Sequence, residues 1–203
     1  MAISEEGEDM TAVDELETLL STASAYREDA TTKRLREDAR VESPDTIAGW
    51  AFDEKPYAPF AKRGLLIGFD AEGGYHRQGA HAKLAKYLLG RVGVDATAED
   101  AFVEGTGLFI RLGATGKIVL VLDPKAHDSD YCHANVVLIA VDDLLRGLKA
   151  KSRLLWLRSD DQGVLIAVVP ARDEKAFRTA LEDCIEDHDE VRRRVTWPSQ
   201  TTA

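Results

Sequence analysis

The chain has 203 residues, of which 44% are hydrophobic, so it can form one domain with an extension or two small domains with a proper core. Its formal net charge of −10 indicates a soluble acidic protein and argues against a strongly basic nucleic-acid surface, although a local basic groove remains compatible with it. The sequence has no apolar run of about 18 residues, which excludes a membrane-spanning helix. It has two cysteines, too few for a disulfide framework, and this low number favours the cytoplasm.

The first segment, 1–46, is expected to be an acidic helical extension. Thr11 and Asp14 resemble a helix N-cap with an acidic third position, and an amphipathic stripe follows within 11–40. That stripe either packs on the domain or contacts a protein partner. The next stretch, 50–60, is either a platform for bases or sugars or an irregular cap over the core, and its aromatic residues are Trp50, Phe52, Tyr57 and Phe60.

Residues 47–198 are expected to form one α/β domain. A strand is predicted at 65–69, and the clearest helix is predicted at 78–92, where apolar residues recur at helical spacing before Gly93. Two strands at 102–112 and 118–122 are predicted to pair across a turn at Ala114-Thr115-Gly116. We expect 118–122 to be the central strand of a mixed sheet, because its apolar run is typical of strands buried on both faces.

The remainder of the chain predicts further alternating elements. A polar loop at 127–133 precedes a strand at 136–141, and Asp142 is expected to cap a short helix. Two more strands are predicted at 154–157 and 164–169, followed by a last helix at 173–191. Several side chains have the chemistry of metal ligands without the spacing of a zinc motif, so their role stays open: His76, His81, His127, Cys132 and His133.

From residue 78 the expected order is helix, three strands, helix, two strands and helix. This order, with GKIVLVLDPK as a strand ending in Asp123-Pro124-Lys125, resembles the core of the PD-(D/E)xK superfamily, which includes restriction endonucleases and archaeal-type Holliday junction resolvases. The resemblance implies a DNA-binding hydrolase, a metal-dependent nuclease. Asp123 and Lys125 would be catalytic, with Glu104 as the second acid. Asp123 and Glu104 would then hold Mg²⁺ against a phosphate.

Three positions depart from that family's pattern. His81 or Ala82 stands where the helix would carry an acid, Leu108 to Ile110 replace the Asp of the first hairpin strand, and Pro124 is the middle residue of the motif. The sequence therefore keeps a second hypothesis of a different class. In it, the chain is a non-enzymatic interaction protein or a structural subunit of a viral or multiprotein assembly, and it contacts a partner through 11–40 or 50–60.

Overall fold

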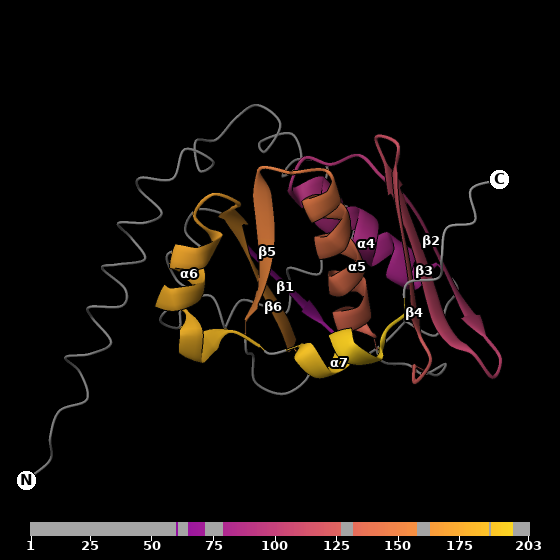
Figure 1. The fold of residues 1–203 in the computed structure, drawn as a ribbon. Coiled ribbons are helices and arrows are strands. Elements are labelled where there is room, and N and C mark those ends of the chain that lie inside the picture. The colour runs from indigo at the N-terminus through magenta and orange to yellow at the C-terminus, as the bar shows by residue number, and fades with distance from the viewer. Residues whose placement is uncertain are drawn as a thin grey trace, which may run out of the picture. The chain divides into compact units, whose positions relative to one another are not determined.

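The computed structural model describes residue 60 and residues 65–71, 79–126, 132–157, 163–186 and 188–196. The chain divides into two compact units, each built from one three-stranded antiparallel sheet and helices (Figure 1). The first unit contains the chain up to Asp70 together with Lys151–Glu186, and the second contains Ala71–Ala150 and Asp187–Ala203. The expected α/β class is therefore confirmed.

The sheet of the first unit has the strand order β1-β6-β5, with β1 at Leu66–Asp70, β6 at Gly163–Pro170 and β5 at Ser152–Leu157. All the side chains of β6 from 164 to 169 are buried, so this central strand is shielded on both faces. Helix α6 (Glu174–Ala180) and a 3₁₀ turn (Glu182–Cys184) follow the sheet. The core between the sheet and α6 contains Phe60, Leu66, Leu155, Leu157, Leu165, Ala167, Val169, Phe177 and Leu181.

The second unit has the strand order β2-β3-β4, with β2 at Thr97–Val103, β3 at Gly107–Ala114 and β4 at Lys117–Asp123. Helix α4 (Ala80–Arg91) precedes the sheet, α5 (Ala134–Gly147) follows it, and α7 (Asp189–Arg194) comes from the C-terminal part of the chain. Both α4 and α5 pack against one face of this sheet (Figure 1), which we call the inner face. Its side chains include Leu108, Ile110, Leu112 and Val121, all fully buried.

The opposite side of the β2–β3–β4 sheet is called the outer face. Because successive side chains of a strand point to opposite sides, the residues that alternate with the buried ones project there. The strand register groups them into three rows, which are Ala101–Phe109–Leu122, Glu99–Arg111–Leu120 and Thr97–Gly113–Ile118. Val103 extends the face at the end of β2.

Two connections in this sheet require special backbone conformations. The β3–β4 turn places Thr115 at φ 48° and Gly116 at φ 74°, as a two-residue hairpin turn requires, so the turn expected at 114–116 is confirmed. At the start of β3, Gly107 has φ 116°, and a Cβ there would lie 2.0 Å from the carbonyl oxygen of Asp123. Position 107 therefore accepts only glycine without a backbone shift.

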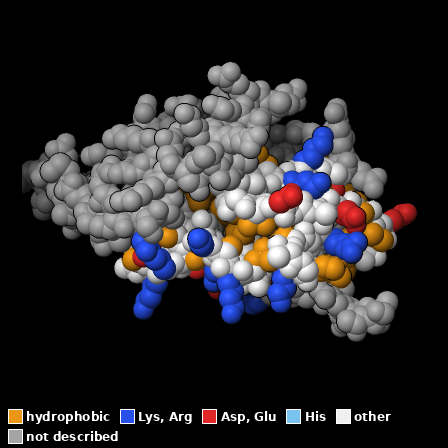
Figure 2. Space-filling model, turned by 90° about the horizontal axis from the view of Figure 1, so that it is seen from above, with side chains coloured by type: hydrophobic (Ala, Val, Ile, Leu, Met, Phe, Trp, Pro, Cys, Tyr) orange, Lys and Arg blue, Asp and Glu red, His pale blue; other side chains and the backbone are white. Residues whose placement is uncertain are grey.

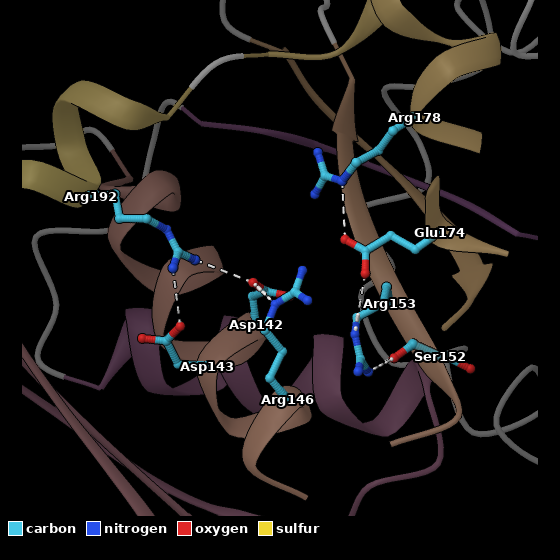
Figure 3. Close-up of polar contacts among 8 residues, drawn as sticks. All are labelled: Asp142, Asp143, Arg146, Ser152, Arg153, Glu174, Arg178 and Arg192. Atoms are coloured by element: carbon cyan, nitrogen blue, oxygen red, sulfur yellow. Dashed lines mark hydrogen bonds and ion pairs between the residues drawn. The ribbon is translucent and has the colours of Figure 1, made fainter. Parts of the chain in front are cut away.

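Polar contacts tie α7 to α5 within the second unit (Figure 3). Asp142 on α5 accepts hydrogen bonds from Arg146 Nε at 2.8 Å and from Arg192 Nη2 at 3.2 Å. Arg192 on α7 also donates through Nη1 to Asp143 at 3.4 Å. Two neighbouring carboxylates on one helix thus hold an arginine of the other.

A separate set of polar contacts lies within the first unit (Figure 3). Glu174, in the first turn of α6, accepts a hydrogen bond from Arg178 Nε at 3.0 Å and forms an ion pair with Arg153 Nε at 3.6 Å. Arg153 belongs to β5, so this pair joins α6 to the sheet. Both side chains of the pair are largely buried, at 11% exposure for Arg153 and 15% for Glu174.

Two expectations about the sheets are wrong for the described strands. Residues 118–122 belong to β4, which is an edge strand, because β3 lies between β2 and β4. Its side chains are not buried on both faces, since Ile118 is 43% exposed. The strands also form two antiparallel sheets rather than one mixed central sheet.

Three expectations about single elements are also corrected. The strand expected at 102–112 is divided by the 104–106 turn into the end of β2 and most of β3. The strand expected at 136–141 is helical, and together with the short helix after Asp142 it forms the single helix α5. The last helix, expected at 173–191, is interrupted because Ile185 has an extended backbone and bridges to Leu157.

Other expectations are confirmed. The helix at 78–92 is α4, and the strands at 65–69, 154–157 and 164–169 are β1, β5 and β6. The extension 1–46, residues 50–59, His76 and His127 lie outside the described residues. Phe60 packs on Phe177 with ring centroids 5.9 Å apart, which fits the interpretation of this residue as part of the core. No helix in the described ranges has both the length and the apolar character needed to cross a membrane.

Candidate functional site

The three residues expected at a catalytic site lie toward one end of the β2–β3–β4 sheet. Asp123 is the last residue of β4 and pairs with Leu108 on β3, and Lys125 follows two residues later. Glu104 lies in the turn that joins β2 to β3, next to the pair of Val103 and Gly107. Glu104 and Lys125 are exposed, whereas the Asp123 side chain is fully buried.

The carboxylate of Asp123 forms an ion pair with Arg194, the last residue of α7. Arg194 Nε donates to both carboxylate oxygens at 3.1 Å, and Nη2 donates to Oδ2 at 2.8 Å. The backbone N–H of Lys125 donates to Oδ1 at 3.0 Å. Two residues beyond Arg194, the backbone of Thr196 pairs with Leu122 in both directions. Asp123 thus connects the end of β4 to the segment that follows α7.

This arrangement bears on the expected metal site. A divalent cation needs lone pairs on carboxylate oxygens, and both oxygens of Asp123 already accept hydrogen bonds from a guanidinium group. A metal at Asp123 would therefore have to displace Arg194 or share its oxygens. Among the residues that the structure describes, no group of three or more His, Cys, Asp and Glu side chains is arranged to hold a metal ion.

A second polar cluster lies on the inner side of the same unit and contains His81, Asp100 and His133. Asp100 on β2 accepts two contacts at Oδ2, from the backbone N–H of His81 at 3.2 Å and from His81 Nδ1 at 3.3 Å. The backbone N–H of His133 donates to His81 Nε2 at 3.1 Å. Nε2 is therefore the acceptor and Nδ1 carries the proton in the neutral ring. Phe102 contacts both rings edge-on.

The cluster supplies hydrogen-bond acceptors to two helix N-termini. The N-cap residues Gly79 and His133 provide no side-chain cap for α4 or α5. Asp100 accepts a hydrogen bond from the backbone N–H of His81 in the first turn of α4, where the helix dipole favours a negative charge. His81 Nε2 accepts a hydrogen bond from the backbone N–H of His133, the N-cap residue of α5. Asp100 Oδ1 is buried and has no hydrogen-bond partner within the described ranges. Both ring nitrogens of His81 are occupied, so we assign it a structural role.

Sequence reasoning identified Asp123 and His81 as polar residues of interest but missed their partners. No local pattern in the sequence links Arg194 to Asp123. Asp100 was not considered, because 97–103 was not recognised as a strand. Within that strand, Asp100 lies between Glu99 and Ala101, whose side chains project to the outer face, so its register would have placed it among the inward-facing residues.

The outer face is apolar around one pair of charges. Val103 is 46% exposed and Ile118 is 43% exposed, while Ala101, Phe109, Leu120 and Leu122 are half-buried. Arg111 Nη1 donates to Glu99 Oε2 at 3.4 Å, and the exposed fractions of the two side chains are 48% and 70%. Figure 2 presents one side of the molecule, on which hydrophobic side chains also lie open between charged ones.

The acidic charge of the chain is concentrated toward its N-terminus. Residues 1–59 contain 15 of the 36 acidic and 6 of the 26 basic residues, a net charge of −9, which leaves −1 for residues 60–203. The net charge of −10 therefore describes the N-terminal segment rather than the two sheets.

Comparisons with known protein families, with curated proteins and with solved structures gave no match.

Proposed function

We propose that the protein is a non-enzymatic interaction protein that binds another protein through the outer face of the β2–β3–β4 sheet. The observation that supports this proposal is the row of apolar side chains on that face, together with Val103 and Ile118, the most exposed large hydrophobic residues in the described part of the chain. Apolar side chains that lie contiguously on a surface are typical of contact sites, whereas single exposed ones are not informative.

The pairing of Asp123 with Arg194 is consistent with this proposal. A buried carboxylate that accepts four hydrogen bonds from Arg194 and Lys125 stabilises the fold without any metal. In an interaction protein of this kind, Asp123 keeps α7 attached to the sheet, and the outer face contacts the protein partner. The exposed charges of Glu99 and Arg111 provide orientation, because charge pairs contribute more to specificity than to affinity.

The test uses a photo-reactive residue on the outer face. Phe109 is replaced by p-benzoylphenylalanine in the full chain, which keeps an aromatic ring at this position, and the protein is irradiated inside the cells that make it. We expect a covalent adduct to a protein. The same group in place of Lys83, an exposed residue of α4, is the control and should give no matching adduct. An adduct to nucleic acid, or none at Phe109, would refute the proposal.

A second candidate function is the metal-dependent nuclease. The specific observation in its favour is that Glu104, Asp123 and Lys125 lie toward the same end of one sheet. The near-neutral charge of residues 60–203 also removes the objection that the whole chain is too acidic to approach DNA. This candidate requires a PD-(D/E)xK-like core, with Mg²⁺ held by Asp123 and Glu104 once Arg194 has moved away.

The nuclease candidate is tested with Mg²⁺ or Mn²⁺ and linear, branched and single-stranded DNA. If it holds, Asp123→Asn should abolish cleavage and Lys125→Ala should lower the rate with less effect on metal affinity. Arg194→Met is the control, because it removes the structural partner of Asp123 but leaves the carboxylate available to a metal. A folded protein that cuts none of these substrates would exclude this function.

A further inference from the structure

The backbone of β2 directs part of its hydrogen-bonding groups away from the sheet. Leu122 on β4 exchanges both of its backbone hydrogen bonds with Thr196, so it makes none with Phe109, its register partner on β3. Hydrogen-bonded pairs alternate along an antiparallel ladder, and Phe109 therefore bonds to Ala101 on β2. The residues of β2 that alternate with Ala101 direct their N–H and C=O groups to the free edge of the strand, and they are Ala98, Asp100 and Phe102.

This edge of β2 has no strand beside it in the described part of the chain. There, β2 pairs only with β3, and no other residue bonds to its outward backbone groups. Two other edge strands carry an isolated bridge, β4 from Leu122 to Thr196 and β5 from Leu157 to Ile185. The seven residues of β2 include neither Pro nor Lys, and their register with β3 has no bulge, so three common means of protecting an edge are missing.

The charges of β2 and of the residues that flank it are all negative. Residues 95–104 contain no Lys or Arg and four acidic residues, which are Asp95, Glu99, Asp100 and Glu104. All of these except Asp100 are exposed. The β2 strand of a second copy would set acids against acids, and the N-terminal segment 1–59, with its net charge of −9, would also be repelled. A cationic segment of another protein is the occupant that these charges favour.

We infer that the edge of β2 binds an extended, cationic segment of the protein partner, which adds to the three-stranded sheet as a fourth strand. The inference rests on the proposed function. In this mode of recognition, backbone hydrogen bonds provide affinity and alternate side chains provide specificity. The side chains of Glu99, Ala101 and Val103 project to the outer face, so the added strand would continue that face toward the body of the partner.

The inner side of the added strand has a candidate contact at Asp100. Its Oδ1 is buried and has no hydrogen-bond partner within the described ranges. The partner residue directly opposite Asp100 would lie on the same side of the sheet, with its Cβ about 4.5–5.5 Å from that of Asp100. A Lys or Arg at this position would supply the missing donor, in agreement with the cationic character that the exposed acids favour.

Removal of one outward N–H tests the inference. The full-length chain carries p-benzoylphenylalanine in place of Phe109, as in the test of the proposed function, and is irradiated inside the cells that make it. Ala98→Pro removes an N–H that points to the free edge and leaves the bonds between Ala101 and residue 109 in place, so the protein adduct should decrease roughly fivefold or more. Ala98→Ser is the matched control, because it keeps the N–H, and it should leave the adduct unchanged. Circular dichroism and urea unfolding should show that both variants fold.

Reversal of the flanking charges tests the partner's chemistry without any change to the backbone. Asp95→Lys/Glu104→Lys should also decrease the adduct roughly fivefold or more, because it repels a cationic segment. Glu182→Lys/Glu190→Lys makes the same charge change at exposed acids outside the sheets and should have no effect. This pair decides the outcome if Ala98→Pro does not fold.

The position of the partner is checked from the end of β2. The same photo-reactive group in place of Val103 should link to the same protein, in a segment with more Lys and Arg than Asp and Glu. A Phe109 adduct that persists in folded Ala98→Pro or in the charge-reversal variant, or an acidic segment linked to position 103, would refute the added strand and leave the proposed function standing. Absence of any protein adduct at Phe109 would instead refute the proposed function, and this inference with it.

Discussion

Replacement of Asp123 by Asn tests whether the buried ion pair holds the second unit together. The side chain keeps its size and shape but loses the charge that pairs with Arg194. In wild type the carboxylate is fully buried and the Arg194 side chain is 25% exposed. Disruption of a buried ion pair through loss of one partner typically costs about 3–5 kcal/mol, because the remaining charge is left without compensation.

The partial exposure of Arg194 reduces this cost, since water can solvate the guanidinium once it is released. We therefore expect Asp123→Asn to lower the free energy of unfolding by about 2–4 kcal/mol, a large part of the roughly 5–15 kcal/mol that stabilises a typical domain. Urea unfolding followed by circular dichroism measures this loss. Hydrogen exchange should also show reduced protection of α7, because Asp123 connects α7 to β4.

A double-mutant cycle isolates the contact itself. Asp123→Asn and Arg194→Met should each destabilise the protein, and the double variant should lose less than the sum of the two, because the second change removes a charge that has already lost its partner. Glu99→Gln provides the control. Its ion pair with Arg111 is exposed and should contribute less than about 1 kcal/mol. If Asp123→Asn costs no more than Glu99→Gln, or if the two effects simply add, the structural role assigned to Asp123 is wrong.

The remaining predictions concern backbone fit, capping and surface charge. Gly107→Ala should cost more than about 2 kcal/mol in urea unfolding, because its Cβ would meet the carbonyl of residue 123, whereas Gly90→Ala in α4, where a Cβ meets nothing within 4 Å, should gain about 0.5–1 kcal/mol. His81→Ala should cost about 2–4 kcal/mol, since it opens a cavity, removes the ring contact to Asp100 and removes the acceptor of the His133 N–H; an unchanged urea midpoint would contradict this. Asp142→Asn should cost about 0.5–1 kcal/mol at low salt and much less in 1 M NaCl, because its arginine partners are about half exposed; a salt-independent effect would contradict this.

Much of the fold follows from local signals in the sequence. Helix α4 was predicted because its buried residues recur at helical spacing and Gly93 ends it. The β3–β4 turn was predicted because a two-residue hairpin requires positive φ, which Gly116 adopts. These features depend on a few neighbouring residues, so the sequence contains the information that decides them.

The incorrect expectations concern features that distant parts of the chain decide. Residues 136–141 have the β-branched composition of a strand, yet they lie in a helix whose side chains are buried around most of its circumference. Burial on all sides depends on neighbours that the local pattern does not reveal. The partners of Asp123 and His81 are missed for the same reason. Arg194 lies 71 residues beyond Asp123, and Asp100 lies 19 residues beyond His81.

The order of elements illustrates how such errors affect an inference about function. From residue 78 the sequence predicted a helix, three strands, a helix, two strands and a helix, and the structure has the same order of types from α4 to α6. The agreement arises because two errors cancel: β2 was not recognised as a strand of its own, and residues 136–141 were counted as one. The three strands of this order are therefore formed, place by place, by other residues than those that suggested the endonuclease resemblance, whereas the helix at 78–92 and the strands at 154–157 and 164–169 lie where the sequence predicts them. Asp123 ends an edge strand rather than a central one. Its side chain is buried and pairs with Arg194, and the apolar outer face of the sheet lies beside it.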